Sequence, residues 1–258
     1  MGIAETGDEL SNSERQGIVP IPRRPAVGLD TSRSKPPNLW SPLTIAMLEV
    51  AALSCRRGDR LLFAQLSFTV AEQTLLHVRG RNGSGKTTLL RTLCGLLRQD
   101  AGDILWRGEN IRELAEEFNR ELLYFGHLNG IKADLTGLEN LRIAATLDQN
   151  PVTDHAILDA LERIGLGGFE DLPTRMLSQG QKKRVALARL ILSKAPLWIL
   201  DEPFTALDAD AVELLQQLIA AQVASGGAVV LTTHQEVALT QGEIQRLTLG
   251  VDGPPAHG

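Results

Sequence analysis

A glycine-rich run over residues 80–87 has the clearest chemistry in this sequence. Its letters, GRNGSGKT, match the pattern G-x-x-x-x-G-K-[S/T] at every fixed position. Glycines let successive backbone N–H groups converge on phosphate oxygens, and a helix that follows adds about half a positive charge at its N-terminus. We therefore predict a phosphate-binding loop in which Lys86 bridges the β- and γ-phosphates of a nucleotide and the Thr87 hydroxyl ligates Mg²⁺. The expected nucleotide contacts are Gly80, Arg81, Asn82, Gly83, Ser84, Gly85, Lys86, Thr87 and Thr88.

The segments on either side of this run are those that a phosphate-binding loop needs. The apolar run 75–79 is typical of a buried strand, and residues 88–93 have helical spacing. A glycine-rich turn that binds nothing is the alternative interpretation. The order of strand, loop and helix favours the phosphate site.

A second chemical group follows a later apolar run. Residues 197–200 predict a buried strand that ends in Asp201 and Glu202. Carboxylates at the end of a buried strand are costly unless they are paired or bind a metal. We interpret Asp201 as the residue that holds Mg²⁺ through water, and Glu202 as the catalytic group that polarises an attacking water. In isolation, a solvated acidic turn before Pro203 would explain the same letters.

The segment over residues 177–181, with the letters LSQGQ, predicts another anion site. Ser178 stands where a helix N-cap belongs, and apolar residues recur along the segment that follows. A helix start with a hydroxyl, a glycine and free N–H groups favours anions. Since the chain has one phosphate-binding loop, this site implies either a second nucleotide-binding unit or a second use of the same phosphate. The basic run 182–184 is interpreted as a solvated helix face without a catalytic role.

Together these motifs resemble the nucleotide-binding subunits of ABC transporters, over roughly residues 48–249. In that family two subunits form a homodimer head to tail, so that each ATP lies between the phosphate-binding loop of one subunit and the signature of the other. The resemblance implies that four signature residues act on the partner's ATP, namely Ser178, Gln179, Gly180 and Gln181. It also implies that His234 is catalytic beside Lys86 and Glu202, as a switch histidine on the γ-phosphate, and that Asp208 belongs to a loop linking the two sites.

Three positions depart from the family pattern. His127 stands where most members have a glutamine that contacts Mg²⁺. It either accepts a hydrogen bond from a Mg²⁺-bound water, which would make the site respond to pH, or merely lines a loop. Arg57 stands near the place of an aromatic ring that stacks on adenine, and it either stacks its guanidinium on the base or is a solvated turn residue. Gln179 replaces a glycine that is usual in the signature, with an effect that the sequence does not predict.

A narrower resemblance is to the ATP-binding subunits of cytochrome c maturation systems. It rests on residues 125–141, on residues 168–173 and on the letters LWILDEPFTALD over residues 197–208. It implies an ATPase that is peripheral to the cytoplasmic face of the bacterial inner membrane and coupled to an integral membrane permease subunit of a haem-delivery complex. Residues 126–141 would be the docking surface for that subunit. The haem chemistry itself has no motif in the chain, since no Cys-x-x-Cys-His site occurs.

Composition agrees with this interpretation. The 258 residues have a net charge of −5 and an apolar fraction of 43%, which is typical of a chain with one substantial core and unlike a nucleic-acid-binding protein. Two cysteines are too few for a disulfide framework, and no apolar stretch approaches the roughly 20 residues that cross a bilayer. The alternatives are the ATP-binding subunit of another ABC transporter, a soluble ABC ATPase of translation or DNA repair, and a nucleotide-binding regulator with little turnover.

The expected fold is α/β, a P-loop NTPase of ABC type with a mostly parallel sheet, a strand-rich N-terminal section and a helical subdomain at about residues 127–185. The ATP-binding domain is expected over residues 47–250, followed by a tail over residues 251–258. Residues 1–46 are rich in Pro, Ser, Gly and charge and predict a disordered extension, so that Met47 as the true start is a hypothesis. Strands are predicted at 103–106, 122–125 and 228–232, and helices at 137–145, 153–164 and 209–224.

Overall fold

The computed structural model describes residues 46–126, 130–235, 237–239 and 241–250. All of them belong to one unit, Pro42–Gly258. Most of the extension predicted over residues 1–46 lies outside the described residues, as does the predicted tail over residues 251–258.

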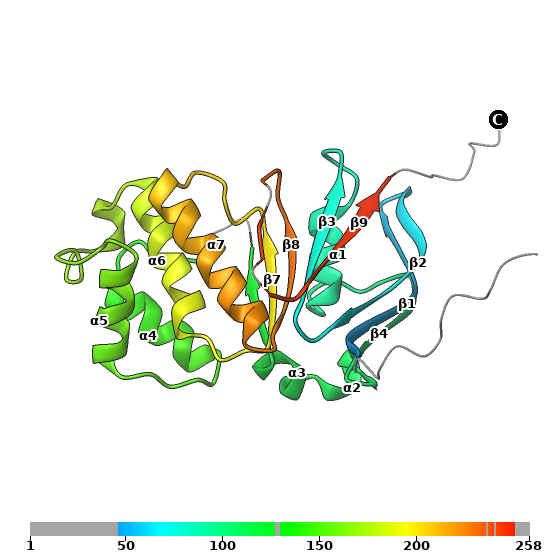
Figure 1. Ribbon diagram of the computed structural model, residues 1–258, viewed down its shortest axis with the longest axis horizontal. Coiled ribbons are helices and arrows are strands. Elements are labelled where there is room, and N and C mark those ends of the chain that lie inside the picture. Colours follow the sequence, from blue (N-terminus) through cyan, green and yellow to red (C-terminus); the bar gives the residue numbers. More distant parts are fainter. Residues whose placement is uncertain (1–45, 127–129, 236, 240, 251–258) are drawn as a thin grey trace, which may run out of the picture. The chain divides into compact units, whose positions relative to one another are not determined.

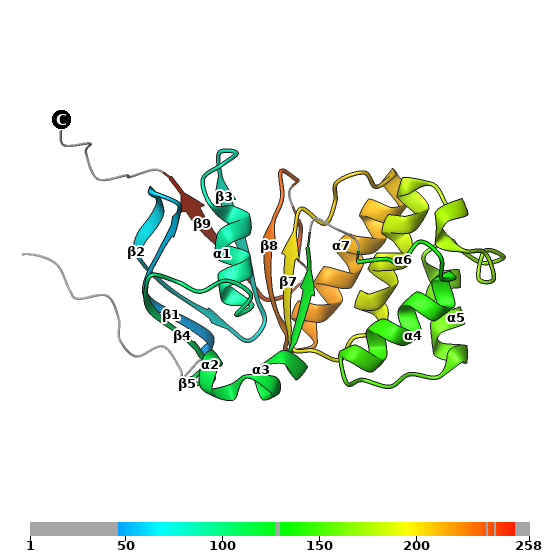
Figure 2. The ribbon, with the colours of Figure 1, turned by 180° about the vertical axis from the view of Figure 1, so that it is seen from behind.

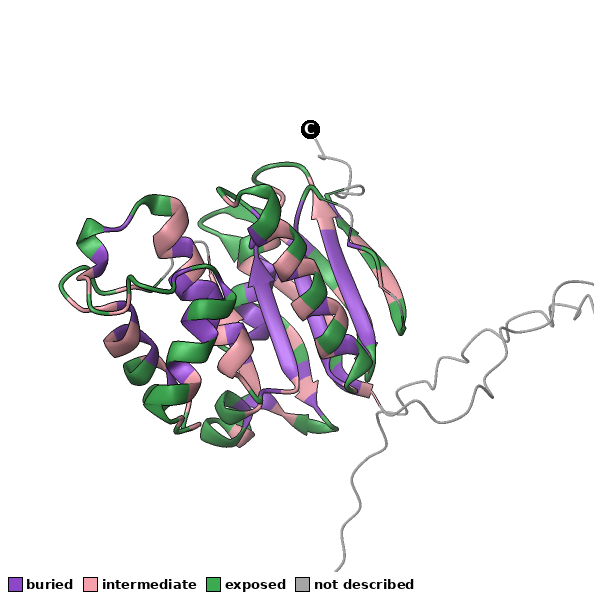
Figure 3. Cartoon of the chain, turned by 60° about the vertical axis from the view of Figure 1, so that its left-hand side comes forward, coloured by how far each residue is buried: buried purple, intermediate pink, exposed green. Residues whose placement is uncertain are grey.

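A five-stranded sheet forms the centre of the fold, with its strands in the order β6-β7-β8-β3-β9 and every pairing parallel (Figure 1). Parallel strands covered on both faces need continuous apolar runs, and β7 and β8 are buried along their whole length (Figure 3). The strands are β3 (Thr74–Gly80), β6 (Leu122–Phe125), β7 (Leu197–Asp201), β8 (Ala228–Thr232) and β9 (Glu243–Leu249). The mostly parallel core predicted from the sequence is therefore confirmed.

An antiparallel sheet, formed by chain segments before and after β3, packs against one face of this core. Its strands, in the order β2-β1-β4-β5, are β2 (Arg60–Ala71), β1 (Ala46–Arg57), β4 (Ala101–Trp106) and β5 (Glu109–Asn110). Apolar residues of this sheet share one buried cluster with helix α1 (Lys86–Leu93) and with Ile199 and Val230 of the parallel sheet. Figure 2 shows the short helices α2 (Ile111–Leu114) and α3 (Glu116–Arg120) between this sheet and β6.

The opposite face of the parallel sheet is covered by helices α6 (Gln179–Leu192) and α7 (Ala209–Ala224). Leu200 and Leu231 point to these helices, whereas their sequence neighbours Ile199 and Val230 point to α1, as the alternation of side chains along a strand requires. The sheet therefore separates α1 from α6 within the chain. The phosphate-binding loop before α1 and the signature at the start of α6 therefore lie on different sides of the sheet.

A separate helical part lies beyond α6, as Figure 1 shows on the left. Helices α4 (Gly137–Leu147) and α5 (Asp154–Arg163) pack with α6 around a third buried cluster that includes Leu141, Ile157 and Val185. Thr136 and Thr153 cap α4 and α5 by accepting backbone N–H bonds, and a 3₁₀ turn at Thr174–Met176 leads back to α6. None of the described helices is long and apolar enough to span a bilayer.

Candidate functional site

The glycine-rich loop joins the end of β3 to the start of α1, as the sequence predicts. Gly80 has φ 151°, and a Cβ there would lie 2.5 Å from Ser84 Oγ and 2.8 Å from the Leu249 carbonyl. Gly85, the residue before α1, has φ 99°, and its added Cβ would lie 3.1 Å from Leu62 Cβ. Both positions need glycine because a side chain would be strained in its backbone conformation and crowded by its neighbours.

Two polar groups in this loop fit a phosphate ligand. The Lys86 ammonium donates a 2.9 Å hydrogen bond to the Gly80 carbonyl, which places this cation at the mouth of the loop. Ser84 Oγ is buried and has no hydrogen-bond partner among the described residues. A buried hydroxyl without a partner is costly, and a phosphate oxygen at this point would satisfy it.

A cavity of about 300 Å³ lies beside the loop, and both Lys86 and His234 line it. Its lining residues come from the end of β3, the start of α1 and the segment after β8: His77, Val78, Arg79, Gly80, Lys86, Thr233, His234 and Gln235. His77 is buried, its Nδ1 accepts a 3.2 Å bond from Arg79 Nε, and its Nε2 lies 2.9 Å from the Thr233 carbonyl. Because Nδ1 is the acceptor, the proton lies on Nε2, which donates to Thr233 and fixes the backbone next to His234.

The acidic strand end lies at the same edge of the sheet. Asp201 is 1% exposed, and its Oδ1 accepts a 2.9 Å bond from the Thr232 hydroxyl. Its Oδ2 is buried and has no partner among the described residues. Glu202 is partly exposed, and its Oε1 lies 3.7 Å from His234 Nε2. The two adjacent carboxylates therefore differ in environment, since one is enclosed and the other faces His234.

The donor set at this strand end fits Mg²⁺. A buried carboxylate oxygen with no partner among the described residues fits a site where a cation, or water held by a cation, completes its coordination. The Thr87 hydroxyl at the start of α1 is exposed and is the second oxygen donor that the sequence assigns to the ion. Carboxylate, hydroxyl and water oxygens are the ligands that Mg²⁺ prefers, usually together with phosphates.

The predicted signature forms the start of α6. Ser178 caps the helix in a capping box, because its Oγ accepts from the Gln181 N–H at 3.2 Å and its N–H donates to Gln181 Oε1 at 2.9 Å. Ser178 and Gln179 are exposed, and a Cβ on Gly180 would meet no atom closer than 3.9 Å. The helix start is thus open on its outer side, and α6 lies on the opposite face of the sheet from α1.

The interpretation of residues 182–184 as a solvated face is wrong. Lys183 is 5% exposed, and its ammonium lies 4.8 Å from the centroid of the Phe125 ring. Burial lowers the pKa of Lys183, and the charges of Asp201 and Glu202 oppose this shift. Arg184 binds both oxygens of Asp208 and the Ile164 carbonyl. The spacing of these residues predicts a charged, solvated helix face. In the structure, α6 packs against β6 and the loop before α7, and this packing encloses the charged groups.

Two of the three departures from the family pattern, His127 and Arg57, concern the metal and adenine contacts. His127 lies outside the described residues. Arg57 is exposed at the end of β1, where it pairs with Arg60 across the turn into β2. The β2 residue Leu62 lies next to Gly85, so this hairpin is close to the phosphate-binding loop. No contact of the described residues decides whether Arg57 would stack on a base.

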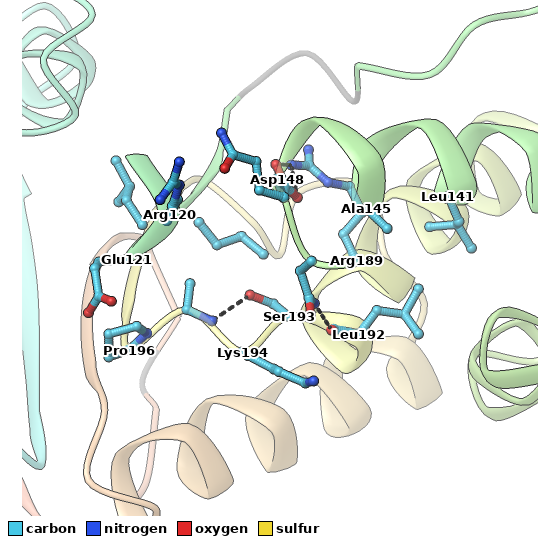
Figure 4. A pocket seen from close by; sticks show the side chains of 15 residues that line it. Arg120, Glu121, Leu141, Ala145, Asp148, Arg189, Leu192, Ser193, Lys194 and Pro196 are labelled. Carbon is cyan, nitrogen blue, oxygen red and sulfur yellow. Dashed lines mark hydrogen bonds and ion pairs between the residues drawn. The ribbon is translucent and has the colours of Figure 1, made fainter. Parts of the chain in front are cut away.

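A second cavity, of about 230 Å³, lies away from these motifs (Figure 4). It is enclosed by the start of β6, the C-terminal end of α4 and the C-terminal end of α6, and Arg189 pairs with Asp148 at 3.2 Å on its wall. None of its lining residues belongs to the phosphate-binding loop, the acidic strand end or the signature. We therefore assign the chemistry to the first cavity.

Comparison with known proteins agrees with this geometry. The family model described as ABC transporter matches residues 63–205, more than half of the chain. A solved structure described as the ATP-binding subunit of an ABC transporter is 27% identical, with a TM-score of 0.66 over 73% of this chain and 79% of its own. A dimeric ATP-binding cassette bound to ADP and phosphate has a TM-score of 0.67 over 79% of this chain and 96% of its own, at 22% identity, and shows the fold alone. These matches define an ABC-type ATP-binding protein.

Relatives with higher sequence identity place the chain in one branch of these proteins. The cytochrome c biogenesis ATP-binding export protein CcmA of Dechloromonas aromatica is 52% identical over 204 residues, which cover 79% of this chain and 100% of the relative. The protein of the same name from Escherichia coli O6:H1 is 46% identical and covers 81% of this chain and 99% of the relative. The chain belongs to this CcmA family of ABC ATPases.

Proposed function

We propose that this protein is the energy-coupling ATPase of an ABC transporter complex for cytochrome c biogenesis, with haem as the cargo that the resemblance implies. The observation that carries the proposal is the meeting of Lys86 and His234 on one cavity, beside a strand end with one enclosed and one accessible carboxylate. The CcmA relatives, whose printed names describe an export protein, support it.

The residues of the loop divide the binding of ATP between them. Gly80 to Thr88 would surround the phosphates with backbone N–H groups, and Lys86 would exchange its bond to the Gly80 carbonyl for the β- and γ-phosphate oxygens. Thr87 and Asp201 would hold Mg²⁺, the latter through water on the partnerless Oδ2. When bound, the ion supplies charge neutralisation to the phosphates.

Hydrolysis would be carried out by Glu202 and His234. Glu202 accepts a hydrogen bond, and then a proton, from the water whose oxygen attacks the γ-phosphorus, while the bond to the ADP oxygen breaks. His234, 3.7 Å from Glu202, would donate to the γ-phosphate oxygens as charge redistributes in the transition state. The partial exposure of Glu202 lets it reach water, whereas the buried Asp201 has no such access.

The ATP site would be completed by a second copy of the chain. Since α1 and α6 lie on opposite faces of the sheet, the loop and the signature of one chain do not enclose the same phosphate. In a head-to-tail homodimer, the exposed Ser178 and Gln179, with the partly exposed Gly180 and Gln181, would present a helix N-terminus to the partner's γ-phosphate.

The membrane partner would dock on the helical part. We propose that an integral membrane permease subunit binds along residues 126–141, within a helical subdomain at about residues 127–185. The ATP-binding domain at residues 47–250 would then be peripheral to the cytoplasmic face of the bacterial inner membrane. The exposed Ile143 and Leu147, one turn apart on α4, extend this surface. A net charge of −5 makes nucleic acid an unsuitable partner.

The Glu202→Gln variant tests this function. We expect kcat of ATP hydrolysis by the complex with its membrane partner to fall about 100-fold or more, with ATP binding retained, because the amide no longer accepts the proton. Glu49→Gln, on the exposed side of β1, is the matched control and should keep wild-type turnover. Wild-type turnover in Glu202→Gln would contradict the catalytic assignment, and purification with ribosomes or DNA-repair proteins, without an integral membrane chain, would contradict the transporter assignment.

A further inference from the structure

Thr232, the last residue of β8, touches both acidic residues of the candidate site. It is fully buried, and it stands opposite Asp201 in the β7–β8 register. Its hydroxyl donates to Asp201 Oδ1 at 2.9 Å and accepts from the Glu202 N–H at 2.9 Å. A hydroxyl has one proton, so the donor and acceptor roles are both fixed by these two neighbours.

The bond to Asp201 orients its carboxylate. With Oδ1 held by Thr232, the carboxylate presents its other oxygen, Oδ2, where the described part of the chain offers no hydrogen-bond partner. That oxygen is the one that we assign to the hydrated cation. The Thr232 hydroxyl holds the plane of the carboxylate in the orientation that presents one oxygen to this position.

The bond to the Glu202 N–H holds a strained backbone. Glu202 has φ 50°, a left-handed conformation that is unfavourable for a residue with a side chain. Its N–H is held by two acceptors on one residue, the Thr232 hydroxyl and, at 3.2 Å, the Thr232 carbonyl. Strained residues at functional sites persist only where their surroundings fix them, and here Thr232 does so.

We propose that Thr232 is a positioning residue for ATP hydrolysis, which sets the carboxylate of Asp201 and the backbone of Glu202 with one hydroxyl. The proposal rests on the roles that we assign to these two acids. Thr232 does not touch the nucleotide in this account. Its loss should therefore lower kcat more than it raises KM for ATP, because the phosphate-binding loop still contacts the triphosphate.

Paired substitutions isolate the hydroxyl from the shape of the side chain. Thr232→Val keeps the shape and removes the hydroxyl, whereas Thr232→Ser keeps the hydroxyl and removes a methyl group. We expect kcat to fall about 10- to 100-fold in Thr232→Val and to stay within about threefold in Thr232→Ser, because only valine leaves the Asp201 oxygen unpaired. Thr232→Ala, compared with Thr232→Ser, repeats the test at the smaller size in case valine prevents folding. Thr74→Val, at a buried threonine at the far end of β3, is the control and should keep wild-type kcat.

Hydrogen exchange at the Glu202 amide gives a measurement that does not depend on turnover. In the nucleotide-free full-length protein, we expect this amide to exchange about 10-fold faster or more in Thr232→Val and at the wild-type rate in Thr232→Ser. Wild-type kcat and wild-type exchange in Thr232→Val, or equal loss in the serine and alanine variants, would overturn the proposal. Loss of turnover in Glu202→Gln with wild-type turnover in Thr232→Val would refute only this inference. Wild-type turnover in Glu202→Gln would instead refute the catalytic assignment on which the inference rests.

Discussion

The two acidic residues of the site, Asp201 and Glu202, have the same chemical group but different surroundings. Asp201 and Glu202 are adjacent carboxylic acids, yet one is 1% exposed at a strand end and the other has a side chain 25% exposed beside His234. The enclosed acid has an oxygen with no partner among the residues that the structure describes and suits a cation, and the accessible acid suits the activation of a water. The different roles that we propose for the two acids follow from these different environments.

The two cysteines are further residues whose environment decides their chemistry. Cys55 and Cys94 are free and buried, and burial raises the pKa of both thiols above the ordinary value. Since the thiolate is the reactive form, we expect neither residue to react with iodoacetamide in the native protein at pH 8, and both to react once guanidinium chloride unfolds it. Mass spectrometry counts the modified sites, and Cys55→Ser isolates Cys94. Rapid labelling of native protein at either cysteine would contradict this packing.

Residues whose role depends on a motif are predicted well from the sequence, and those whose role depends on register are not. The spacing around Lys86 and the apolar run before Asp201 specify their elements, and the structure has both. Thr232 and Lys183 were missed because a buried hydroxyl and a buried ammonium become visible only when β8 pairs with β7 and α6 packs against Phe125. The sequence shows only a polar residue at the end of an apolar run and a run of three basic residues there.

Among the elements, α6 connects the parts of the molecule that must respond to ATP. Its start is the signature, and its residue Arg184 binds the Asp208 carboxylate and donates a 2.7 Å bond to the Ile164 carbonyl at the end of α5. Asp208 in turn caps α7 by accepting from the Ala211 N–H at 3.0 Å. One guanidinium therefore joins the end of α5 to the loop before α7.

Removing Arg184 should loosen this junction. We expect Arg184→Ala to lower the free energy of unfolding by about 1–3 kcal/mol, because the Ile164 carbonyl loses its donor in a largely buried place. Arg184→Lys is the matched variant and should recover only part of the loss, since an ammonium does not reproduce the forked contacts of a guanidinium. Urea unfolding of the three proteins measures the difference, and equal midpoints would contradict it.

The same junction predicts a dependence of stability on pH. The hydrogen bonds from Arg184, and next that from the Ala211 N–H, lower the pKa of Asp208. A lowered folded-state pKa gives a stabilisation that is complete above about pH 5 and is lost as pH falls through that pKa. We expect Asp208→Asn, which keeps an N-cap acceptor but no charge, to be less stable than wild type at pH 7 and to approach it near pH 3. A constant difference in urea midpoint over this range would show that the carboxylate charge is not involved.

At the scale of the whole molecule, the sheet keeps the two anion-binding motifs apart. The phosphate-binding loop and α1 belong to one face, with the antiparallel sheet, and α6 with its signature belongs to the other (Figures 1 and 2). The order of elements could be predicted from the sequence because alternating strands and helices specify a parallel core. The faces on which α1 and α6 lie depend on strand order, which hydrophobic periodicity does not encode.

Complementation between two inactive chains tests whether one chain completes another's site. Lys86→Ala should inactivate the phosphate-binding loop. Gly180→Asp should inactivate the signature by repelling the triphosphate, and α6 should tolerate it because the position is open and acids stabilise a helix start. We expect each variant alone to lose about 100-fold or more of its ATPase activity, and the mixed dimer to regain turnover, because one site then combines an intact loop with an intact signature. The control mixes Lys86→Ala with Glu202→Gln, whose defects lie in the same half of the site, so that neither site of that mixed dimer is complete. Recovery in both mixtures or in neither, measured on heterodimers purified through two different tags, would rule out a site shared between chains.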